Sequence, residues 1–371
     1  MAHICMVLIG DILYDGRVRK EIMTLTKSGH KVDLVVSAYQ KNDFADTNLG
    51  AQAHYIPMKI WSSISMNLLE NWSFNRKAAS VIQRIRPTHI HCHDLSSLPS
   101  GVWAKKKIGA KLIFDAHELY PESWGGIKER AWGHIERMHV KSCDHIIMPE
   151  KNRISYFKKK YPGIGEPILL QNFPRRSDIT NHRANVFREL YPIRTEQKII
   201  LYTGLIASGR YVEELIDSMA VCTDEFVLVM LGGSRKNYNE YREFLYRKIK
   251  GYKLENRVFI HGFVPHKELL KYMASADIGT AFYRNTNLNN FYCASNKLYE
   301  FIALEKAVLT NNYPGLIETV ERYKQGVCLS EVTPMTLVQS YIKANDTRYV
   351  TPGTKKFYWE DEEDALTRLY D

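Results

Sequence analysis

Two histidines and an aspartate stand close together in the segment THIHCHD, at residues 88–94. If this segment is a β-strand, His91 and His93 lie on one face, because strand side chains alternate. Imidazole nitrogens are common metal ligands, so this pair is a candidate metal site. However, the spacing places no carboxylate or cysteine beside the pair. We therefore expect the histidines to be structural or to contact substrate, and we expect no metal.

Several common cofactor motifs are missing. The first strand, at 3–10, is followed by GDILYDG and not by G-x-G-x-x-G, which argues against a nicotinamide or flavin function. The sequence contains no G-x-x-x-x-G-K-[ST], no H-E-x-x-H and no paired-cysteine zinc motif. These absences exclude the P-loop class and leave no sign of a resident cofactor.

The composition is that of a globular protein with two domains. The chain has 371 residues, of which 45% are hydrophobic and 25% charged. At about 150 residues per domain this length predicts two domains, and the composition excludes a disordered or coiled-coil protein. No apolar run approaches the roughly 18 residues that a spanning helix needs, and the N-terminus does not resemble a signal peptide. Six cysteines without C-x-x-C are typical of a reduced, cytoplasmic enzyme.

Short apolar strands alternate with helical segments along the chain. Strands are expected at 3–10, 31–37, 88–94, 111–117 and 145–150, and again at 198–204, 226–233, 257–262, 277–282 and 307–312. Such alternation predicts parallel, doubly wound sheets. Residues 173–197 are polar and contain two prolines, and we interpret them as a linker. The expected domains are 1–172 and 198–356, with a last helix at 357–371 that crosses back to the first domain.

Five segments together resemble one known family. They are DGRVRKEIMTLTKSGHKVDLV (15–35), FDAHELYPE (114–122), YTGLIASGRYVEELI (202–216), RVFIHGFVPHKELLKYMASADIG (257–279) and SNKLYEFIALEKAV (295–308). In this order and spacing they look like the group 1 glycosyltransferases of family 4. The resemblance implies a GT-B fold, with two Rossmann-like domains facing across a cleft. It also implies sugar transfer from a nucleotide sugar with retention of configuration and without a bound metal.

The resemblance places the nucleotide-sugar donor on the second domain. Without a metal, protein cations must neutralise the leaving diphosphate, and Arg210 at the start of a helix is the best candidate. Lys297 is a second candidate, because many members carry a basic residue where this chain has Leu205. A surface arginine is the structural alternative for Arg210. The implied donor-binding residues are Gly204, Gly209, Arg210, Gly232, Gly233, Gly262, Phe263, Val264, Tyr292, Ser295, Asn296, Lys297, Leu298 and Glu300.

His117, Arg210 and Glu300 are the implied catalytic residues. Glu300 corresponds to the second acid of the family's E-x7-E pattern, which binds the ribose hydroxyls. The first acid would stand at position 292, where this chain has Tyr292. This departure leaves the contact with the donor sugar, and the sugar itself, open. His117 would contact the donor sugar, although a core or capping role is the alternative.

The resemblance places a glycan or lipid-linked acceptor on the first domain. The expected acceptor or cleft residues are Gly10, Asp11, Asp15, Gly16, His93, Asp94, His117 and Glu118, with Glu122 nearby. Turn formation is an equal explanation for the two loop aspartates.

The net charge of +10 favours anionic partners. Residues 60–77 carry Trp61, Leu68 and Trp72 at roughly helical spacing with Arg76 and Lys77 after them, which is typical of an interfacial helix. Packing of this helix on its own domain is the alternative. We expect a cytoplasmic enzyme of surface-polysaccharide or glycolipid synthesis, peripheral on the inner face of the membrane. Another GT-B enzyme, such as an epimerase or a phosphorylase-like protein, and an inactive nucleotide-sugar binder remain open. No nucleic-acid motif is visible.

Overall fold

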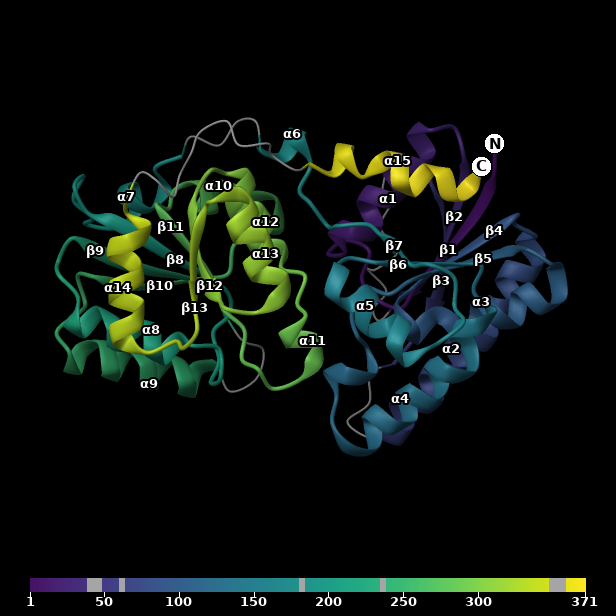
Figure 1. Cartoon of the computed structure of the whole chain (residues 1–371), viewed down its shortest axis with the longest axis horizontal. Helices are drawn as coiled ribbons and strands as arrows, with labels where there is room; N and C mark the ends of the chain where they lie inside the picture. Colours follow the sequence, from purple (N-terminus) through teal and green to yellow (C-terminus); the bar gives the residue numbers. More distant parts are fainter. Residues whose placement is uncertain (39–48, 60–63, 180–183, 234–237, 347–357) are drawn as a thin grey trace. The chain divides into compact units, whose positions relative to one another are not determined.

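The computed structural model describes residues 1–38, 49–59, 64–179, 184–233, 238–346 and 358–371. It divides into two units, and each is described by itself (Figure 1). Unit 1 contains Met1–Gln171, Asn287–Asn289 and Glu360–Asp371. Unit 2 contains Asn172–Thr286 and Asn290–Trp359.

Unit 1 is built on a seven-stranded parallel sheet in the order β3-β2-β1-β4-β5-β6-β7. The strands are β1 His3–Leu8, β2 Lys31–Ala38, β3 Gln52–Pro57, β4 His89–His93, β5 Lys111–Asp115, β6 His145–Met148 and β7 Ile168–Leu169. The order reverses between β1 and β4, and ligands of doubly wound sheets bind at such a reversal, beyond the carboxyl ends of the strands. The central strands are apolar on both faces, as a sheet covered twice requires.

Helices cover both faces of the unit 1 sheet. The helices are α1 Gly16–Lys27, α2 Ile64–Ile85, α3 Asp94–Ile108, α4 Gly126–His139 and α5 Lys151–Lys160. In Figure 1, α1 lies on one side of the sheet and α2 and α3 lie on the other. The face of β4 that carries His91 and His93 is turned toward α1, while Cys92 faces Gly101 of α3.

The C-terminal segment packs on the α1 side of unit 1. It forms α15 Glu363–Thr367 and the short helix Arg368–Tyr370. The Thr24 hydroxyl of α1 donates to Glu363, and Tyr370 shares a hydrogen bond with Nδ1 of His91 at 2.7 Å. The sequence analysis expected this crossing for residues 357–371. The structure assigns Glu360–Asp371 to unit 1, Tyr358 and Trp359 fall in unit 2, and residue 357 lies outside the described part of the chain.

Unit 2 repeats the architecture with a six-stranded parallel sheet in the order β10-β9-β8-β11-β12-β13. Its strands are β8 Lys198–Leu205, β9 Phe226–Gly233, β10 Val258–Gly262, β11 Ile278–Ala281, β12 Ala307–Asn311 and β13 Gly326–Leu329. The order reverses between β8 and β11, which places the loop after β8 at the expected position for a ligand.

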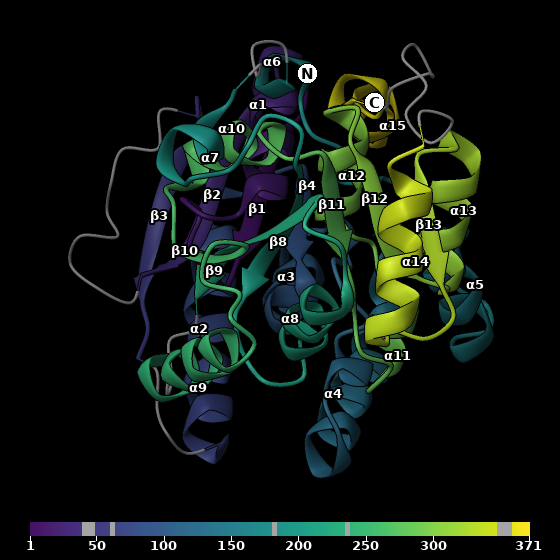
Figure 2. The ribbon, with the colours of Figure 1, turned by 90° about the vertical axis from the view of Figure 1, so that its left-hand side faces the viewer.

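Two apolar clusters fix the helices of unit 2 on its sheet. One cluster joins the sheet to α8 Val212–Val221, α9 Tyr238–Gly251 and α14 Pro334–Ala344 (Figure 2). The other joins the opposite face to α7 Val186–Leu190, α10 Leu269–Ala274, α12 Asn296–Ala303 and α13 Pro314–Tyr323. Two further short helices are α6 Arg176–Ile179 and α11 Leu288–Phe291.

The segment expected to be a linker, 173–197, belongs to unit 2. Phe187 of α7 is fully buried in the second apolar cluster, and Ile193 lies in the same cluster. The segment is mostly polar, so its two buried apolar residues do not stand out in the sequence, and for this reason the pattern indicated a linker.

Two helical glycines provide a matched test of the packing in unit 1. In Gly101→Ala the new Cβ would lie 2.5 Å from Sγ of Cys92 and 2.7 Å from a Leu112 methyl group. We expect a loss of about 1–3 kcal/mol in the free energy of unfolding through overpacking. In Gly133→Ala of α4 the Cβ meets nothing within 4 Å, and we expect a gain of up to about 1 kcal/mol. Denaturant unfolding measures both; equal effects would contradict this packing.

Candidate functional site

The carboxyl ends of β4 and β5 bring the polar residues of unit 1 together. His93 is the last residue of β4 and is paired in register with Asp115, the last residue of β5. Asp94 and His117 follow these strands directly, as the sequence analysis expected for residues that line a cleft. The sheet therefore places four polar side chains from two strand ends at one edge.

Arg17 and Asp115 form a buried ion pair that joins α1 to β5. The Arg17 guanidinium donates through Nε to Oδ2 of Asp115 at 2.8 Å, and through Nη2 to Oδ1 at 2.9 Å. Its Nη1 donates to the carbonyl of Leu170 at 2.9 Å. Burial works against the carboxylate, but Arg17 together with His117 and His93 outweighs it, and they hold the pKa of Asp115 well below its usual range. Two-point pairing of this kind fixes both distance and orientation.

His117 is held by carboxylates on two sides. Its Nε2 lies 3.1 Å from Oδ2 of Asp115 and 3.2 Å from Nδ1 of His93, and its Nδ1 lies 3.6 Å from Oδ2 of Asp94. Burial disfavours the charged ring, but Asp94 and Asp115 outweigh it and raise the pKa of His117 to about 10. The ring is therefore an imidazolium at neutral pH, which donates hydrogen bonds and cannot act as a base.

Asp94 has a strained backbone at the start of α3. Its φ is +60°, a conformation that residues other than glycine adopt mainly where the surroundings impose it. Among the described residues, its buried Oδ1 has no hydrogen-bond partner. Burial raises the pKa of Asp94 to about 6 in spite of the nearby His117 charge. An unsatisfied acceptor on strained backbone marks Asp94 as the strongest candidate in unit 1 for contact with a polar ligand.

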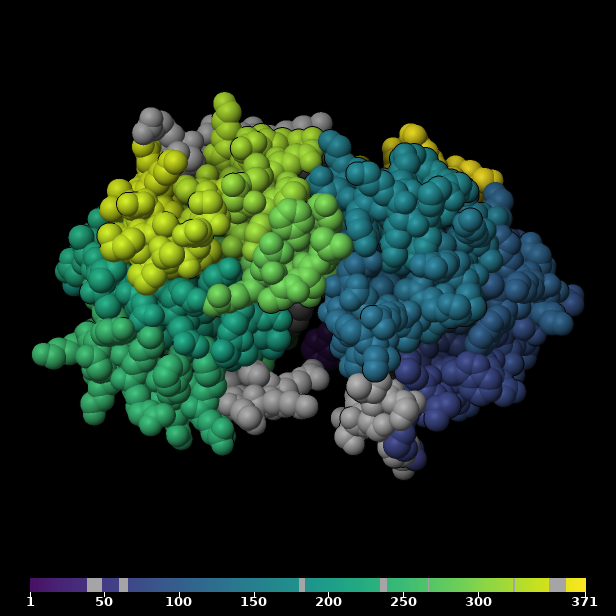
Figure 3. Space-filling model, turned by 60° about the horizontal axis from the view of Figure 1, so that its bottom comes forward, coloured from purple at the N-terminus to yellow at the C-terminus, as the bar shows by residue number. Residues whose placement is uncertain are grey.

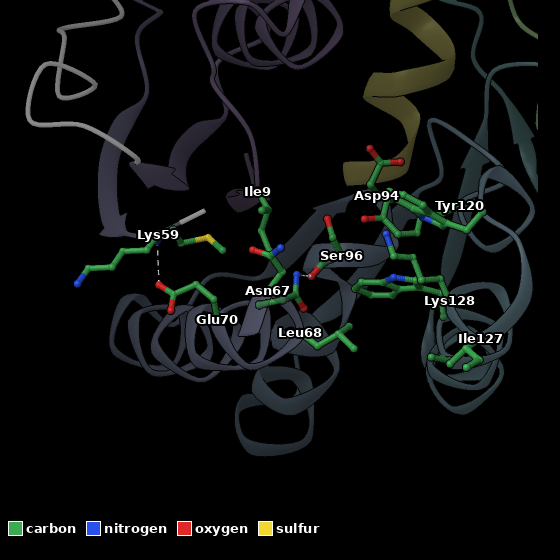
Figure 4. A pocket seen from close by; sticks show the side chains of 15 residues that line it. Ile9, Lys59, Asn67, Leu68, Glu70, Asp94, Ser96, Tyr120, Ile127 and Lys128 are labelled. Atoms are coloured by element: carbon green, nitrogen blue, oxygen red, sulfur yellow. Dashed lines mark hydrogen bonds between the residues drawn. The ribbon is translucent and has the colours of Figure 1, made fainter. Parts of the chain in front are cut away.

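Asp94 also lines a pocket of about 410 Å³ that lies wholly within unit 1. Figure 4 shows Asn67 and Leu68 of α2, Ile127 and Lys128 of α4 on the right, and Asp94 near Tyr120. The wall on the α4 side is aromatic and apolar, with Tyr120, Trp124 and Trp132. A few polar groups on a mainly apolar wall are typical of a small-molecule site. The sequence analysis did not single out this wall, because the aromatic residues fit an ordinary core equally well.

The loop acids after β1 have structural roles. Oδ1 of Asp15 accepts from the amide of Val18 at 3.0 Å and caps α1, and Oδ1 of Asp11 accepts from the amide of Leu13 at 2.9 Å. The turn explanation thus accounts for both. Gly10 is fixed by the Ser37 hydroxyl, and Gly16 is the first residue of α1.

The two glutamates after β5 differ in their surroundings. Glu118 is exposed and accepts from the Ser123 hydroxyl at 3.2 Å. Glu122 is buried and pairs with Lys160 at 2.6 Å and with the Tyr156 hydroxyl at 2.8 Å. Glu122 is therefore part of the internal packing of unit 1, and it does not line the pocket.

In unit 2, Lys297 lies against the turn that follows β8. A Cβ placed on Gly204 would come within 2.7 Å of Nζ of Lys297, so any residue other than glycine at position 204 would displace the Lys297 ammonium. Nζ also lies 5.5 Å from the Tyr202 ring centre and 5.9 Å from the Tyr283 ring centre. Burial, together with the charge of Arg210, lowers the pKa of Lys297 to about 8. Two cations thus lie close together at the strand end.

The two helix starts of this site have different caps. Arg210 is exposed and precedes α8, whose N-cap residue, Tyr211, has a left-handed φ of +61° and provides no side-chain hydrogen bond. At α12, Oγ of Ser295 accepts from the amide of Leu298 at 3.2 Å and is 2.8 Å from the Tyr283 hydroxyl. Leu298 is one of the expected donor-binding residues, and the Ser295 cap occupies its amide.

The glycine-rich strand ends of unit 2 approach one another closely. Gly204 and Gly232 are paired in register, and a Cβ on Gly232 would overlap the carbonyl oxygen of Gly204 at 1.8 Å. A Cβ on Gly233 would meet the Phe263 ring at 2.4 Å. Phe263 is 67% exposed and so offers an open ring beside this glycine. Gly209 and Gly262 have positive φ, which explains their residue type.

The remaining predicted donor residues also lie in unit 2. Glu300 is on α12 and its charge acts on both Lys297 and Tyr283, so it belongs to the same cluster. Tyr292 is half-buried with its ring 5.0 Å from that of Phe291. Asn296 accepts from the Asn172 amide at 3.0 Å, and Val264 packs against the second apolar cluster. Their roles toward a donor stay predictions.

Two family models match the chain. The model for glycosyl transferases group 1 matches residues 185–348, and the model for glycosyltransferase family 4 matches residues 18–166. The chain belongs to the group 1 glycosyltransferases of family 4, and it is a glycosyltransferase with the two Rossmann-like domains of the GT-B fold. A search of curated protein sequences found no match.

Solved structures share the fold at low sequence identity. HepE from Anabaena, in complex with UDP and glucose, superposes with a TM-score of 0.73 at 14% identity and covers 100% of this chain and 99% of its own. Sucrose-phosphate synthase from Thermosynechococcus elongatus has a TM-score of 0.78 at 18% identity, with coverages of 100% and 98%. The lipopolysaccharide outer core galactosyltransferase WaaB has a TM-score of 0.59 at 14% identity, with coverages of 100% and 96%.

The buried Arg17–Asp115 pair gives a direct test of the unit 1 site. Arg17→Met would leave the Asp115 carboxylate buried without its partner, and we expect a loss of about 3–5 kcal/mol in the free energy of unfolding. Lys158→Met is the matched control, because Lys158 pairs with Glu166 at the surface. There we expect a change of about 0–1 kcal/mol. Denaturant unfolding measures both; a small effect at Arg17 would show that this ion pair does not organise the unit.

Proposed function

We propose that the protein is a retaining glycosyltransferase that moves a sugar from a nucleotide-sugar donor to a glycan or lipid-linked saccharide. Unit 2 would hold the donor and unit 1 the acceptor. The observation that carries this proposal is the gathering of Lys297 and Arg210 at the glycine turn after β8. Two neighbouring cations at a strand end are suited to a diphosphate, whose charge would otherwise be unfavourable in a partly buried site.

In the proposed reaction the acceptor hydroxyl oxygen forms a bond to the anomeric carbon of the donor. The bond from that carbon to the diphosphate breaks, and its electron pair stays on the nucleoside diphosphate. The hydroxyl proton passes to the departing diphosphate, so the products are a glycoside and a nucleoside diphosphate. Lys297 and Arg210 would stabilise the charge that develops on the leaving group. Glu300 would hold the ribose hydroxyls.

The HepE structures, solved with UDP, with UDP-glucose and with UDP and glucose, make a UDP-sugar the first donor to test. The exposed Phe263 ring beside Gly233 offers a stacking surface for a base. Neither feature selects one base, so the donor panel includes GDP-sugars as well as UDP-sugars. The donor sugar depends on the consequences of Tyr292, where the family carries an acid.

The pocket of unit 1 supports the acceptor side of the proposal. Asp94 offers an unsatisfied oxygen to a sugar hydroxyl, and the aromatic wall of Tyr120, Trp124 and Trp132 suits the apolar face of a sugar ring. The fold is shared with a lipopolysaccharide galactosyltransferase, which supports an acceptor in surface-polysaccharide or glycolipid synthesis.

We further propose that unit 1 rests on the cytoplasmic face of a membrane. Leu69 and Trp72 of α2 and Ile127 of α4 are 67%, 51% and 85% exposed. The segments of unit 1 coloured indigo to teal, which include α2 and α4, form the face of this unit turned to the viewer in Figure 3. Within the described residues, no helix combines the length and apolar character needed to cross a bilayer. Such side chains would instead enter the lipid interface.

The structure changes two details of this membrane surface. Leu68 lines the pocket and is only half-exposed, and Trp61 lies outside the described residues. Three lysines of unit 1 are engaged in ion pairs and so contribute less to attraction by anionic lipid: Lys105 with Asp144, Lys158 with Glu166, and Lys160 with Glu122 and Glu136. The proposal therefore rests on the exposed apolar side chains more than on the basic runs.

The role of Arg210 can be measured by transfer and donor hydrolysis. We expect Arg210→Ala to lower turnover about 100-fold or more, which corresponds to about 3 kcal/mol of barrier, with little change in unfolding temperature. Arg322→Ala, an exposed arginine of α13, is the control. If Arg210→Ala keeps the rates of the wild type, we would assign the contact with the diphosphate to Lys297 and not to Arg210. Donor binding without transfer or hydrolysis in the wild type would favour an inactive binder, and sugar isomerisation would favour an epimerase.

Lys297 predicts a pH dependence of nucleotide binding. Its pKa of about 8 means that the ammonium is mostly charged at pH 7 and mostly neutral at pH 9. The affinity for UDP should therefore fall by up to about tenfold between these pH values, because the neutral amine no longer attracts the diphosphate. Titration calorimetry at pH 7, 8 and 9 measures this fall.

Two variants separate Lys297 from its neighbours. The titratable or charged groups around its amine are Arg210, Glu300, Cys293, Tyr202 and Tyr283. Burial raises the pKa of Tyr202 to about 12 and that of Tyr283 higher still, so neither tyrosine ionises below pH 9. The affinity of Lys297→Arg for UDP should not fall between pH 7 and pH 9, and Lys297→Met should bind UDP weakly at every pH. If the affinity of either variant falls as much as that of the wild type, another group is responsible for the pH dependence.

Flotation with anionic liposomes tests the membrane proposal. The wild type should float at low salt, and a Leu69→Ser, Trp72→Ser variant should float at least several-fold less, because the apolar contact is lost. Met335→Ser, Ile342→Ser is the control, since these α14 side chains of unit 2 are 59% and 61% exposed. Equal flotation of all three proteins would show that the α2 surface does not bind lipid.

A further inference from the structure

Four fully buried side chains of unit 1 present metal-ligating atoms to one another. Glu21 comes from α1, His91 and His93 from β4, and Asp115 from the end of β5. One ligand atom from each residue lies within 4.8 Å of the others. All four side chains are 0% exposed. The two carboxylates that the sequence spacing could not supply are thus brought to the histidine pair by the fold.

The atoms that face one another in this cluster lack hydrogen bonds. Within the described residues, neither oxygen of Glu21 and neither Nε2 of His91 or His93 has a hydrogen-bond partner. Oε2 of Glu21 lies 3.7 Å from Nε2 of His91 and 4.0 Å from Nε2 of His93. These distances are too long for hydrogen bonds, so Oε2 of Glu21 and the two Nε2 atoms are buried near one another without satisfying one another.

The opposite nitrogens of both rings are engaged. Nδ1 of His91 is 2.7 Å from the Tyr370 hydroxyl, and Nδ1 of His93 is 3.2 Å from Nε2 of His117 and 3.5 Å from Oδ2 of Asp115. Metal-ligating histidines commonly use one nitrogen for the metal and the other for such an orienting contact. The rings are also stacked, with centres 4.3 Å apart, and both Nε2 atoms lie within 4.0 Å of Oε2 of Glu21.

The charges of the cluster are compatible with a divalent cation. Arg17 takes both oxygens of Asp115 and lies 3.1 Å from Oε1 of Glu21. Bound to a divalent cation, the carboxylates of Glu21 and Asp115 would balance Arg17 and part of the metal charge.

We infer that Glu21, His91, His93 and Asp115 form a structural divalent-cation site, with zinc as the preferred ion. Two imidazoles and two carboxylates are a ligand set that zinc accepts in tetrahedral geometry. Bond lengths of about 2.0–2.1 Å correspond to ligand separations of about 3.4 Å. Three of the observed separations are 3.7–4.0 Å and all lie within 4.8 Å, so the side chains would have to move closer together on binding the ion. The ion would join α1, β4 and β5 within unit 1 and take no part in transfer.

Metal retention by the untagged full chain tests this inference. The chain is stripped with a chelator, incubated with Zn²⁺, dialysed, and analysed for metal content and unfolding temperature. We expect about one zinc ion per chain and a higher unfolding temperature than in the stripped protein. Glu21→Gln, which preserves shape, should lose both effects, while His89→Gln should retain both. His89 is the matched control because it lies buried on the same strand outside the cluster.

Comparing the wild type and Glu21→Gln after removal of metal shows whether the variant simply fails to fold. Glu21→Gln without zinc should unfold near the temperature of the stripped wild type, because glutamine preserves the shape of the buried side chain. A wild type that retains no zinc and gains no stability would overturn the site. Equal zinc retention by the wild type and Glu21→Gln would place the ion elsewhere on the chain and overturn it as well.

Discussion

The buried pairing of Arg17 with Asp115 is the contact on which the site of unit 1 depends. A carboxylate with no exposed surface is tolerated only because a guanidinium meets it at two points, and the third donor of Arg17 holds the chain at Leu170. Once Asp115 is ionised it holds His117 as an imidazolium, and His117 in turn faces Asp94 at the pocket. This ion pair therefore keeps a charged carboxylate among the polar groups between α1 and the pocket.

Unit 2 follows a different principle, because its strand end gathers cations. Glycine at positions 204 and 232 lets β8 and β9 approach closely and leaves room for the Lys297 amine over the turn. Burial and the neighbouring Arg210 make that ammonium less favourable, as its lowered pKa shows. An anionic ligand would relieve this repulsion. The buried charges of unit 1 therefore pair with one another, whereas the two cations of unit 2 would be stabilised by a bound diphosphate.

Periodicity in the sequence predicted the two parallel sheets and their main strands, because both faces of each strand are buried and the segments are separated by clear helix signals. It did not predict β13 and α14, although Thr333 followed by Pro334 is a common helix start. The predicted pairing of His91 and His93 on one face is confirmed. Their carboxylate partners could not be predicted from the spacing, because Glu21 comes from α1 and Asp115 from β5. The same holds for Arg17 with Asp115, 98 residues apart.

We propose that unit 2 binds the nucleotide of the donor at the carboxyl end of β8 and the start of α12. Hydrogen–deuterium exchange of the full chain, with and without the nucleoside diphosphate that raises its unfolding temperature most, tests it directly. Amides of residues 204–212 and 295–300 should exchange more slowly with the nucleotide bound, while α5 at Lys151–Lys160 of unit 1 should be unchanged. Protection confined to unit 1, with no change in either segment of unit 2, would contradict the account.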